Sequence, residues 1–328
     1  MPEKLFRVAL REALDEEMER DEKVFLIGED IGMFGGAYRV TEGLLDRYGP
    51  MRVVDAPIAE EVIVGTAIGA AMSGLRPVVE MMTINFSLLA YDQVVQNAAK
   101  IRYMFGGEVS LPLVIRLPGG AGHQLSSQHS HSFEVLYGFI PGLLVVAPTT
   151  PEDAKGLLKS AIRTDNPVMF LESMSLYNVR GEVPDGDYTT PIGRAAVRRS
   201  GRDLTLIGVS RQAVLAGIAA QRLEDEDVDA EVIDLRSLRP IDWQTVVSSV
   251  KKTGRLLVVE EGWPTYGVGA EISSGVQERA FDYLDAPILR LGGAEVPMPY
   301  NQEMEKAAIP SADDIVARAL RVVGRNGA

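Results

Sequence analysis

The three histidines of the chain, His123, His129 and His131, lie close together in the segment RLPGGAGHQLSSQHSHSF. Imidazole is the side chain best suited to moving protons near neutral pH. The segment follows a short apolar run at 112–116, which predicts a buried strand, and then a glycine-rich turn. Loops that leave the carboxyl ends of parallel strands are where α/β proteins bind ligands. At least one of these histidines is therefore expected to take part in chemistry.

Other interpretations of this segment stay open. Each histidine taken singly is explained about equally well as an exposed polar residue of a loop. His129 and His131 are two residues apart and could face one side of an extended segment, but no third ligand for zinc is indicated. Ser126, Ser127 and Ser130 would suit a Ser-His hydrolase, yet the strained nucleophile-elbow pattern is missing.

The adjacent acids Glu60 and Glu61 form the second candidate. They follow Pro57 and precede a predicted helix, 60–73, made largely of small apolar residues. The simpler interpretation is that both acids complement the positive end of the helix dipole. The alternative is that one of them is held near the core for chemistry. The residue pattern alone does not decide between the two.

The elements that would position these residues alternate along the chain. Short apolar runs bounded by Gly, Pro or Asp predict strands at 24–27, 52–55, 77–82, 112–116, 143–148 and 167–172. Segments of helical period predict helices at 6–20, 60–73, 91–100 and 151–162. Repeated strand-helix alternation indicates an α/β fold with a doubly wound parallel sheet.

A second alternation of the same kind follows a segment rich in Gly, Pro, Asp and Thr that shows no periodicity. We therefore predict two doubly wound domains, at 1–180 and 203–328, joined by a linker at 181–202. Helices are predicted at 212–223, 243–251, 269–282 and 311–323 in the second domain. A length of 328 residues suits two domains of this size.

Composition excludes several classes of function. The formal net charge of -13, without a basic cluster, argues against a nucleic-acid or anionic-membrane partner. The absence of cysteine excludes disulfides, thiolate metal sites and a cysteine nucleophile. Acidic residues interrupt the first apolar stretch, so no signal peptide or membrane anchor is read at the N-terminus, and a cytoplasmic location is expected.

The chain resembles, nearly from end to end, the beta subunits of the thiamine-dependent 2-oxo acid dehydrogenase decarboxylating components, with the pyruvate dehydrogenase member closest. The residues that carry the resemblance are GEDIGMFGGAYRVTEGL, RVVDAPIAE, GAAMSGLRPVVEMMTINF, YDQVVQNAAKIRYMFGG, QHSHSF, PGLLVVAPTTPEDAKGLLKSAIRTDNPV, DLRSLRPID, LLVVEEG and VPMPY. The resemblance implies a thiamine pyrimidine-binding domain followed by a transketolase-type C-terminal domain. It also implies oxidative decarboxylation of pyruvate with reductive acetylation of lipoyl groups, or the same chemistry on a branched-chain 2-oxo acid or acetoin.

Site residues follow from the matched motifs. Glu60 in PIAE matches the glutamate that shares its proton with N1′ of the aminopyrimidine of thiamine diphosphate, and Glu61 is left with the structural role. Glu29 and Phe86 match positions that line the pyrimidine, with Met82 close by. His129 matches the active-site histidine of the beta-subunit loop, expected to assist proton transfer or stabilise charge during acyl transfer to lipoyl.

The resemblance also concerns metals. A potassium-site loop of relatives matches Leu113, Ala161, Ile162, Thr164 and Asn166, although Thr164 stands where Asp is usual. The Gly-Asp-Gly motif that holds the magnesium of the diphosphate is missing, since Asp185-Gly186-Asp187 lies in the predicted linker without the right context. The resemblance therefore implies an alpha subunit that holds the magnesium and shares the cofactor, in an α2β2 heterotetramer, and a lipoyl acyltransferase core as a further partner.

The sequence also allows two functions of other classes. The run TYGVGAEISSG departs from a dinucleotide fingerprint at its third glycine, so a nicotinamide-binding oxidoreductase is a distant alternative. A non-catalytic α/β scaffold that only assembles with a partner is another.

Overall fold

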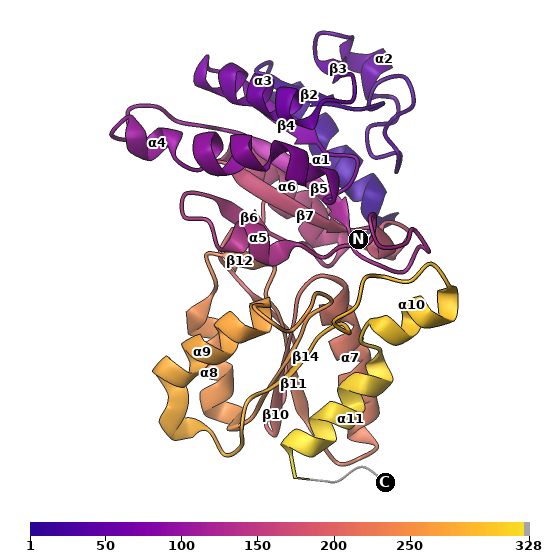
Figure 1. Cartoon of the computed structure of the whole chain (residues 1–328), viewed down its shortest axis with the longest axis vertical. Helices are drawn as coiled ribbons and strands as arrows, with labels where there is room; N and C mark the ends of the chain where they lie inside the picture. Colours follow the sequence, from indigo (N-terminus) through magenta and orange to yellow (C-terminus); the bar gives the residue numbers. More distant parts are fainter. Residues whose placement is uncertain (325–328) are drawn as a thin grey trace. The chain divides into compact units, whose positions relative to one another are not determined.

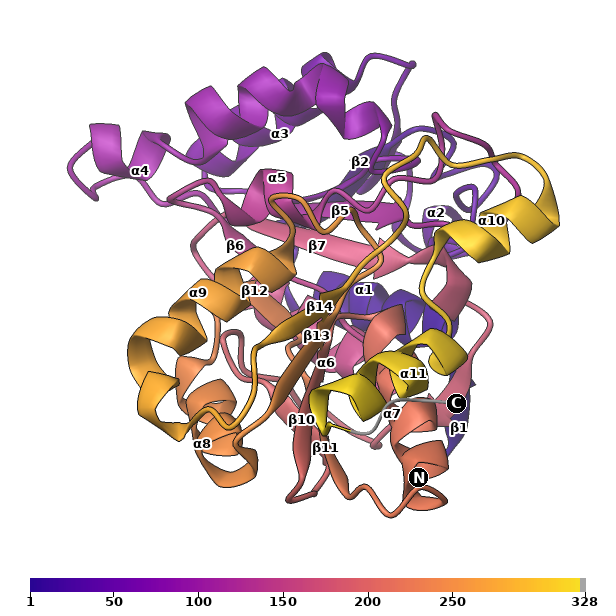
Figure 2. The ribbon, with the colours of Figure 1, turned by 60° about the horizontal axis from the view of Figure 1, so that its bottom comes forward.

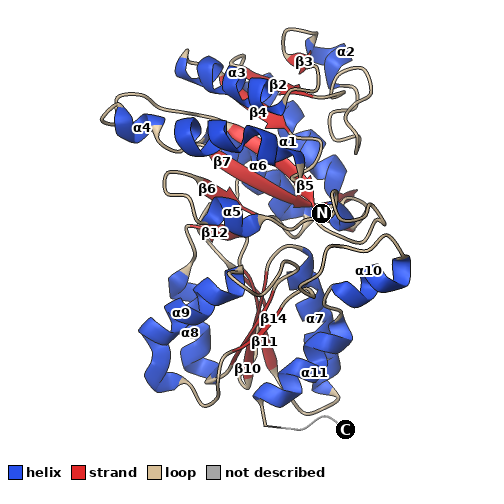
Figure 3. Cartoon of the chain, viewed as in Figure 1, coloured by secondary structure: helices blue, strands red, loops and turns tan. Residues whose placement is uncertain are grey.

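The computed structural model describes residues 1–324, which form two compact units. Unit 1 contains residues 1–119 and 136–192, and unit 2 contains residues 120–135 and, of the described residues, 193–324. The segment 120–135, which a division by sequence places in the first domain, is thus grouped with the second. Each unit is a sheet with helices on both faces (Figure 3), as predicted for a doubly wound α/β fold.

The sheet of unit 1 is parallel, with strand order β6-β7-β5-β4-β2-β3. Its strands are β2 (Val24–Gly28), β3 (Val53–Asp55), β4 (Arg76–Glu80), β5 (Val114–Gly119), β6 (Leu144–Val146) and β7 (Val168–Ser173). A separate antiparallel pair is formed by β1 (Glu3–Leu5) and β8 (Arg180–Glu182). The central strands are buried and mostly apolar because helices cover both faces, and Arg116 on β5 and Glu172 on β7 are buried charged exceptions.

The helices of unit 1 are α1 (Phe6–Arg20), α2 (Leu44–Tyr48), α3 (Glu60–Met72), α4 (Ile101–Met104), α5 (Glu134–Gly138) and α6 (Pro151–Arg163), with short η1 (Phe86–Ala90), η2 (Gln93–Ala98) and η3 (Met174–Leu176). Helix α5 begins in the segment 134–135 of unit 2. Helices α1 and α6 pack side by side on one face of the sheet, and α3 lies on the other (Figures 1 and 2). Phe6, Leu10 and Leu14 recur every four residues of α1 and are fully buried.

Unit 2 contains a five-stranded sheet with order β14-β13-β10-β11-β9, in which only β9 is antiparallel to its neighbour. Its strands are β9 (Ala196–Arg199), β10 (Leu204–Gly208), β11 (Ala230–Asp234), β13 (Leu256–Val259) and β14 (Leu289–Leu291), and a short β12 (Ser237–Arg239) lies outside this sheet. Strand β9 falls inside the predicted linker, which is therefore not irregular throughout.

The helices of unit 2 are α7 (Arg211–Glu224), α8 (Trp243–Thr253), α9 (Val268–Ala280), η4 (Phe281–Tyr283), α10 (Gln302–Ala308) and α11 (Ala312–Val322). Helices α8 and α9 cover one face of the sheet, and α7 and α11 cover the other (Figure 1). Helix α11 begins with a complete capping box between Ser311 and Asp314. Among the helices in residues 1–324, none has the length and apolar character needed to span a membrane.

Candidate active site

Two buried carboxylates, Glu29 and Glu60, lie at the carboxyl edge of the unit 1 sheet. Glu29 directly follows β2, and Glu60 begins α3, which follows β3. Because β2 and β3 are parallel neighbours, both residues are delivered to the same edge. Asp55, at the end of β3, fixes the loop after Glu29 by accepting hydrogen bonds from Gly32 N (2.6 Å) and Met33 N (3.1 Å).

Within residues 1–324, no hydrogen bond or ion pair compensates for the burial of these two carboxylates. Glu29 is 7% exposed and Glu60 is 5% exposed. Over residues 1–324, neither side chain forms a hydrogen bond or an ion pair, and Glu60 relies on the N-terminal dipole of α3. Burial, and then the negative charges of Glu60 and Asp30, raise the pKa of Glu29. Two buried acids in this state favour a ligand that donates to, or shares a proton with, one of them.

Glu61 has a different environment from its neighbour. It is exposed in the first turn of α3, and its carboxylate accepts a 3.4 Å hydrogen bond from the Gln93 side chain. This is the environment of an acid that complements a helix dipole at the surface.

Met82 and Phe86 lie after β4, the other neighbour of β2 in the sheet. Both are partly buried, and Phe86 begins η1, which packs against α3. The Ile84 amide donates to Pro118 O (2.6 Å) and ties this turn to the end of β5. Unit 1 thus brings the predicted residues Glu29, Glu60, Met82 and Phe86 to one edge of its sheet, with an apolar side and an acidic side.

The histidine segment 120–135 belongs to unit 2. His123 is exposed, whereas His129 and His131 are partly buried. The His131 ring stacks on Phe133 (4.2 Å between centroids) and meets Trp263 edge-on, and burial lowers the pKa of His131. His131 is therefore held in place by packing against these two rings.

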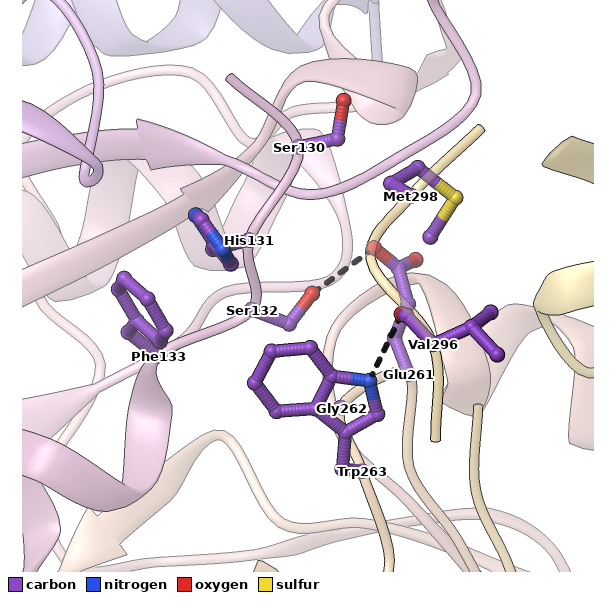
Figure 4. A pocket seen from close by; sticks show the side chains of 9 residues that line it. All are labelled: Ser130, His131, Ser132, Phe133, Glu261, Gly262, Trp263, Val296 and Met298. Atoms are coloured by element: carbon purple, nitrogen blue, oxygen red, sulfur yellow. Dashed lines mark hydrogen bonds between the residues drawn. The ribbon is translucent and has the colours of Figure 1, made fainter. Parts of the chain in front are cut away.

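Glu261 is a residue of this region that sequence analysis did not single out. It follows β13 and accepts a hydrogen bond from Ser132 Oγ (2.9 Å), as Figure 4 shows. Burial, and then the charges of Glu261 and Glu260, raise the pKa of Glu134 to about 7. The adjacent acids of LLVVEEG, directly after a buried parallel strand, were the available signal.

The start of α9, which contains the run TYGVGAEISSG, is occupied by the carboxylate of Glu260. Its Oε1 accepts a hydrogen bond from Gly269 N (3.1 Å), and a Cβ atom added at Gly267 would lie 2.3 Å from its Oε2. Glu260 is 4% exposed, and burial raises its pKa to about 7. A dinucleotide would place its pyrophosphate at such a helix N-terminus. The carboxylate therefore argues against the nicotinamide interpretation.

The residues of the predicted potassium site pair with arginine. The Arg76 guanidinium donates to the carbonyl oxygens of Ile162 (2.9 Å) and Thr164 (3.1 Å). Arg102 donates to Asn166 Oδ1 (2.9 Å), and Leu113 O accepts from Val168 N (2.8 Å). Ala161 lies buried in the last turns of α6.

The Arg76 guanidinium already binds the carbonyl oxygens of Ile162 and Thr164, and its positive charge would repel a potassium ion. The contacts of Arg76 and Arg102 at these residues do not fit a potassium ion. The potassium site is therefore only a prediction from the sequence. In the part of the chain that the structure describes, no group of three or more His, Asp or Glu side chains is arranged to hold a metal.

Comparison with known proteins assigns the two parts of the chain to known domain families. Residues 3–180 match the family model of the transketolase pyrimidine-binding domain, and residues 193–315 match that of the transketolase C-terminal domain. A split-gene transketolase described as an inactive beta4 tetramer superimposes with a TM-score of 0.81 over 98% of this chain and 99% of its own. Its sequence identity is 22%, so this likeness concerns the fold alone.

Sequence relatives are closer. The mitochondrial pyruvate dehydrogenase E1 component subunit beta of Dictyostelium discoideum is 50% identical over 98% of this chain and 91% of its own length. The subunit of the same name in Rickettsia felis is 49% identical over 96% of this chain and 97% of its own length. Identity at this level over nearly the whole length confirms the predicted resemblance. The chain belongs to the family of pyruvate dehydrogenase E1 component beta subunits, with a transketolase pyrimidine-binding domain followed by a transketolase C-terminal domain.

Proposed function

We propose that this chain is the beta subunit of a thiamine diphosphate-dependent enzyme that decarboxylates pyruvate and acetylates lipoyl groups. The observation that carries the proposal is the pair of buried carboxylates, Glu29 and Glu60, which lack a partner in residues 1–324. Their position at the same edge of the sheet as Phe86 and Met82 fits an aminopyrimidine, which needs an acidic partner at a ring nitrogen and an apolar face. Family membership gives the same assignment.

Thiamine diphosphate supplies the electron sink that decarboxylation of a 2-oxo acid requires. In our proposal, Glu60 holds the proton shared with N1′ of the aminopyrimidine, where its burial keeps water away. Glu29, whose pKa is raised by burial and then by the negative charge of Glu60, is a second carboxyl at the same edge of the sheet. The half-buried Phe86 and Met82 orient the ring by apolar contact. His129 acts later, during acyl transfer to lipoyl.

The proposal includes partners. An alpha subunit would hold the diphosphate through magnesium and complete an α2β2 heterotetramer, and a lipoyl acyltransferase core would accept the acyl group. The cytoplasmic location stays a prediction, because the relative from Dictyostelium discoideum is named as mitochondrial.

A substrate comparison tests the proposed reaction. The chain is purified with its alpha subunit, and kcat/KM for lipoyl acylation is measured with pyruvate and 2-oxoisovalerate, and for acetoin cleavage in the same preparation. We expect pyruvate to be preferred by about tenfold or more, since one or two extra methyl groups change binding in a fitted pocket by about 1–3 kcal/mol. A preference for 2-oxoisovalerate or acetoin would assign the chain to that reaction instead.

A further inference from the structure

The segment 120–135 is fixed within unit 2 by two glutamates on separate elements, of which Glu305 is buried and Glu261 is partly buried. Glu261 follows β13, and Glu305 lies in α10. Both are remote in sequence from the segment that they hold. Their hydrogen bonds fall on either side of His129, so the position of that side chain depends on them.

Glu261 joins the two ends of the segment. Its Oε1 accepts hydrogen bonds from Ala121 N (2.8 Å) and from Ser132 Oγ (2.9 Å). The side chain of Glu261 is 9% exposed, and its Oε2 lies 3.4 Å from an Arg211 guanidinium nitrogen. Hydrogen bonds to a buried carboxylate are stronger than those between neutral groups. A single oxygen atom thereby closes the base of the histidine loop.

Glu305 holds the first turn of the segment. Its carboxylate accepts hydrogen bonds from Gly122 N (2.9 Å) and Gln124 N (3.1 and 3.2 Å). Glu305 is 2% exposed and forms no ion pair within residues 1–324. Removing a carboxylate from water without a cation is costly, and these backbone N–H groups are what compensates for it. Such an arrangement does not arise from general surface packing.

The backbone of the segment is in a conformation that needs this support. Gln124 and Ser126 have φ angles of 55° and 66°, which non-glycine residues adopt at a cost of about 1 kcal/mol or more each. The His129 amide then donates to Ser126 O (3.3 Å). Glu305 therefore fixes the turn that contains Gln124 and Ser126, and the His129 amide is hydrogen-bonded to this turn.

The other side of His129 is fixed by packing. Residues 130–133 line a small pocket together with residues 261–263 (Figure 4). Its volume of about 30 Å³ has room for one or two water molecules, which is too little for a substrate. The pocket lies between the histidine segment and the residues that follow β13, and the hydrogen bond from Ser132 Oγ to Glu261 joins its two sides.

We propose that Glu261 and Glu305 are positioning residues that set the location of His129. This inference rests on the proposed role of His129 in acyl transfer. A displacement of about 1 Å of a reacting group can lower a rate by about a hundredfold. Loss of either carboxylate should therefore reduce acyl transfer although neither side chain touches the reacting atoms.

The test uses the complete α2β2 enzyme with Glu305→Ala, Glu305→Gln and His129→Ala. We expect Glu305→Ala to lower kcat for lipoyl acylation tenfold to a hundredfold, with decarboxylation to an artificial acceptor nearly unchanged, as in His129→Ala. Glu305→Gln keeps one oxygen acceptor and should recover most of the loss. The double variant Glu305→Ala/His129→Ala should acylate lipoyl no more slowly than His129→Ala alone. The effects of two substitutions do not add when one residue acts through the other. Glu303→Ala, an exposed position on the same helix, is the matched control.

A second measurement separates this inference from the proposed function. Amide hydrogen exchange of Glu305→Ala, and of Glu261→Gln, should accelerate within residues 120–135 and remain unchanged elsewhere. Three results would overturn the positioning role. These are unchanged amide exchange in residues 120–135, an equal loss of lipoyl acylation and of decarboxylation in Glu305→Ala, and a loss in the double variant equal to the sum of the two single losses. If His129→Ala left lipoyl acylation intact while exchange still accelerated, the proposed role of His129 would fail, and the positioning role in catalysis would fall with it.

Discussion

Replacing Glu60 by Gln is expected to slow exchange of the thiamine C2 proton with solvent by about a hundredfold to ten-thousandfold, the usual range for loss of a positioned acid-base group. The amide fills the same space in the first turn of α3 but cannot share a proton with the aminopyrimidine. Glu60 has no hydrogen-bond partner within residues 1–324, so the substitution breaks no contact of the fold. Assembly with the alpha subunit should survive. Proton exchange measured by NMR after quenching in acid reports the effect directly.

Glu61→Gln is the matched control for this experiment. It changes the neighbouring acid of the same helix turn, which is exposed and accepts a hydrogen bond from the Gln93 side chain. We expect its exchange rate to stay within about twofold of the unmodified enzyme. Normal exchange in Glu60→Gln, or an equal loss in both variants, would remove Glu60 from the catalytic role.

Replacing Arg116 by Met is expected to destabilise the protein by about 3–5 kcal/mol, because it leaves two buried carboxylates without their cation. Arg116 lies on β5 and is 1% exposed. Its guanidinium donates to Glu172 through two nitrogens (2.7 and 2.8 Å) and also to Glu80. Glu80 and Glu172 come from the flanking strands β4 and β7, so the three side chains tie the centre of the sheet together.

The direction in which the stability of Arg116→Met changes with pH follows from the pKa of Glu80. Burial raises its pKa, and Arg116 is the group that opposes this rise. Without Arg116, the folded-state pKa of Glu80 should lie further above its unfolded value. Stability of Arg116→Met should then fall as pH rises, and its deficit should be smaller at pH 5 than at pH 8. Urea unfolding at the two pH values measures this difference.

Arg47→Met provides the comparison for a surface position. Arg47 pairs with Asp15 and Glu19 but is 45% exposed, so its loss should cost far less stability than the loss of Arg116. A similar loss for Arg47→Met and Arg116→Met, or a deficit in Arg116→Met that does not depend on pH, would contradict the account of this network.

Periodicity and capping residues predicted much of the fold. The helix predicted at 6–20 is α1 (Phe6–Arg20), because apolar residues recur at its buried face and neighbouring positions are polar. Helix α11 starts where Ser311 and the following acids predicted a cap. The helix predicted at 91–100 was wrong in type, since Gln93–Ala98 forms a π-helix. A hydrophobic pattern over so short a segment does not distinguish hydrogen bonds four residues apart from those five apart.

The site was predicted less completely than the fold. The histidine loop stood out because all three histidines follow a predicted strand, whereas Glu60 and Glu29 received their roles only from the resemblance to the family. The role of Glu305 could not be predicted, since α10 is short and its contacts to Gly122 and Gln124 join distant parts of the sequence. The Arg116 network likewise depends on which strands are neighbours in the sheet. Strand order is a three-dimensional property that no local pattern contains.

The central claim is that this chain binds the aminopyrimidine half of thiamine diphosphate and needs a second chain for the rest. Calorimetric titration of thiamine diphosphate with magnesium into this chain, the alpha subunit and their mixture tests the claim most directly, with NADH as the competing ligand. We predict saturable binding of thiamine diphosphate in the mixture at one cofactor per pair of subunits, lost or greatly weakened with either chain alone, and no binding of NADH. Binding of NADH by this chain, with no binding of thiamine diphosphate after the alpha subunit is added, would contradict it.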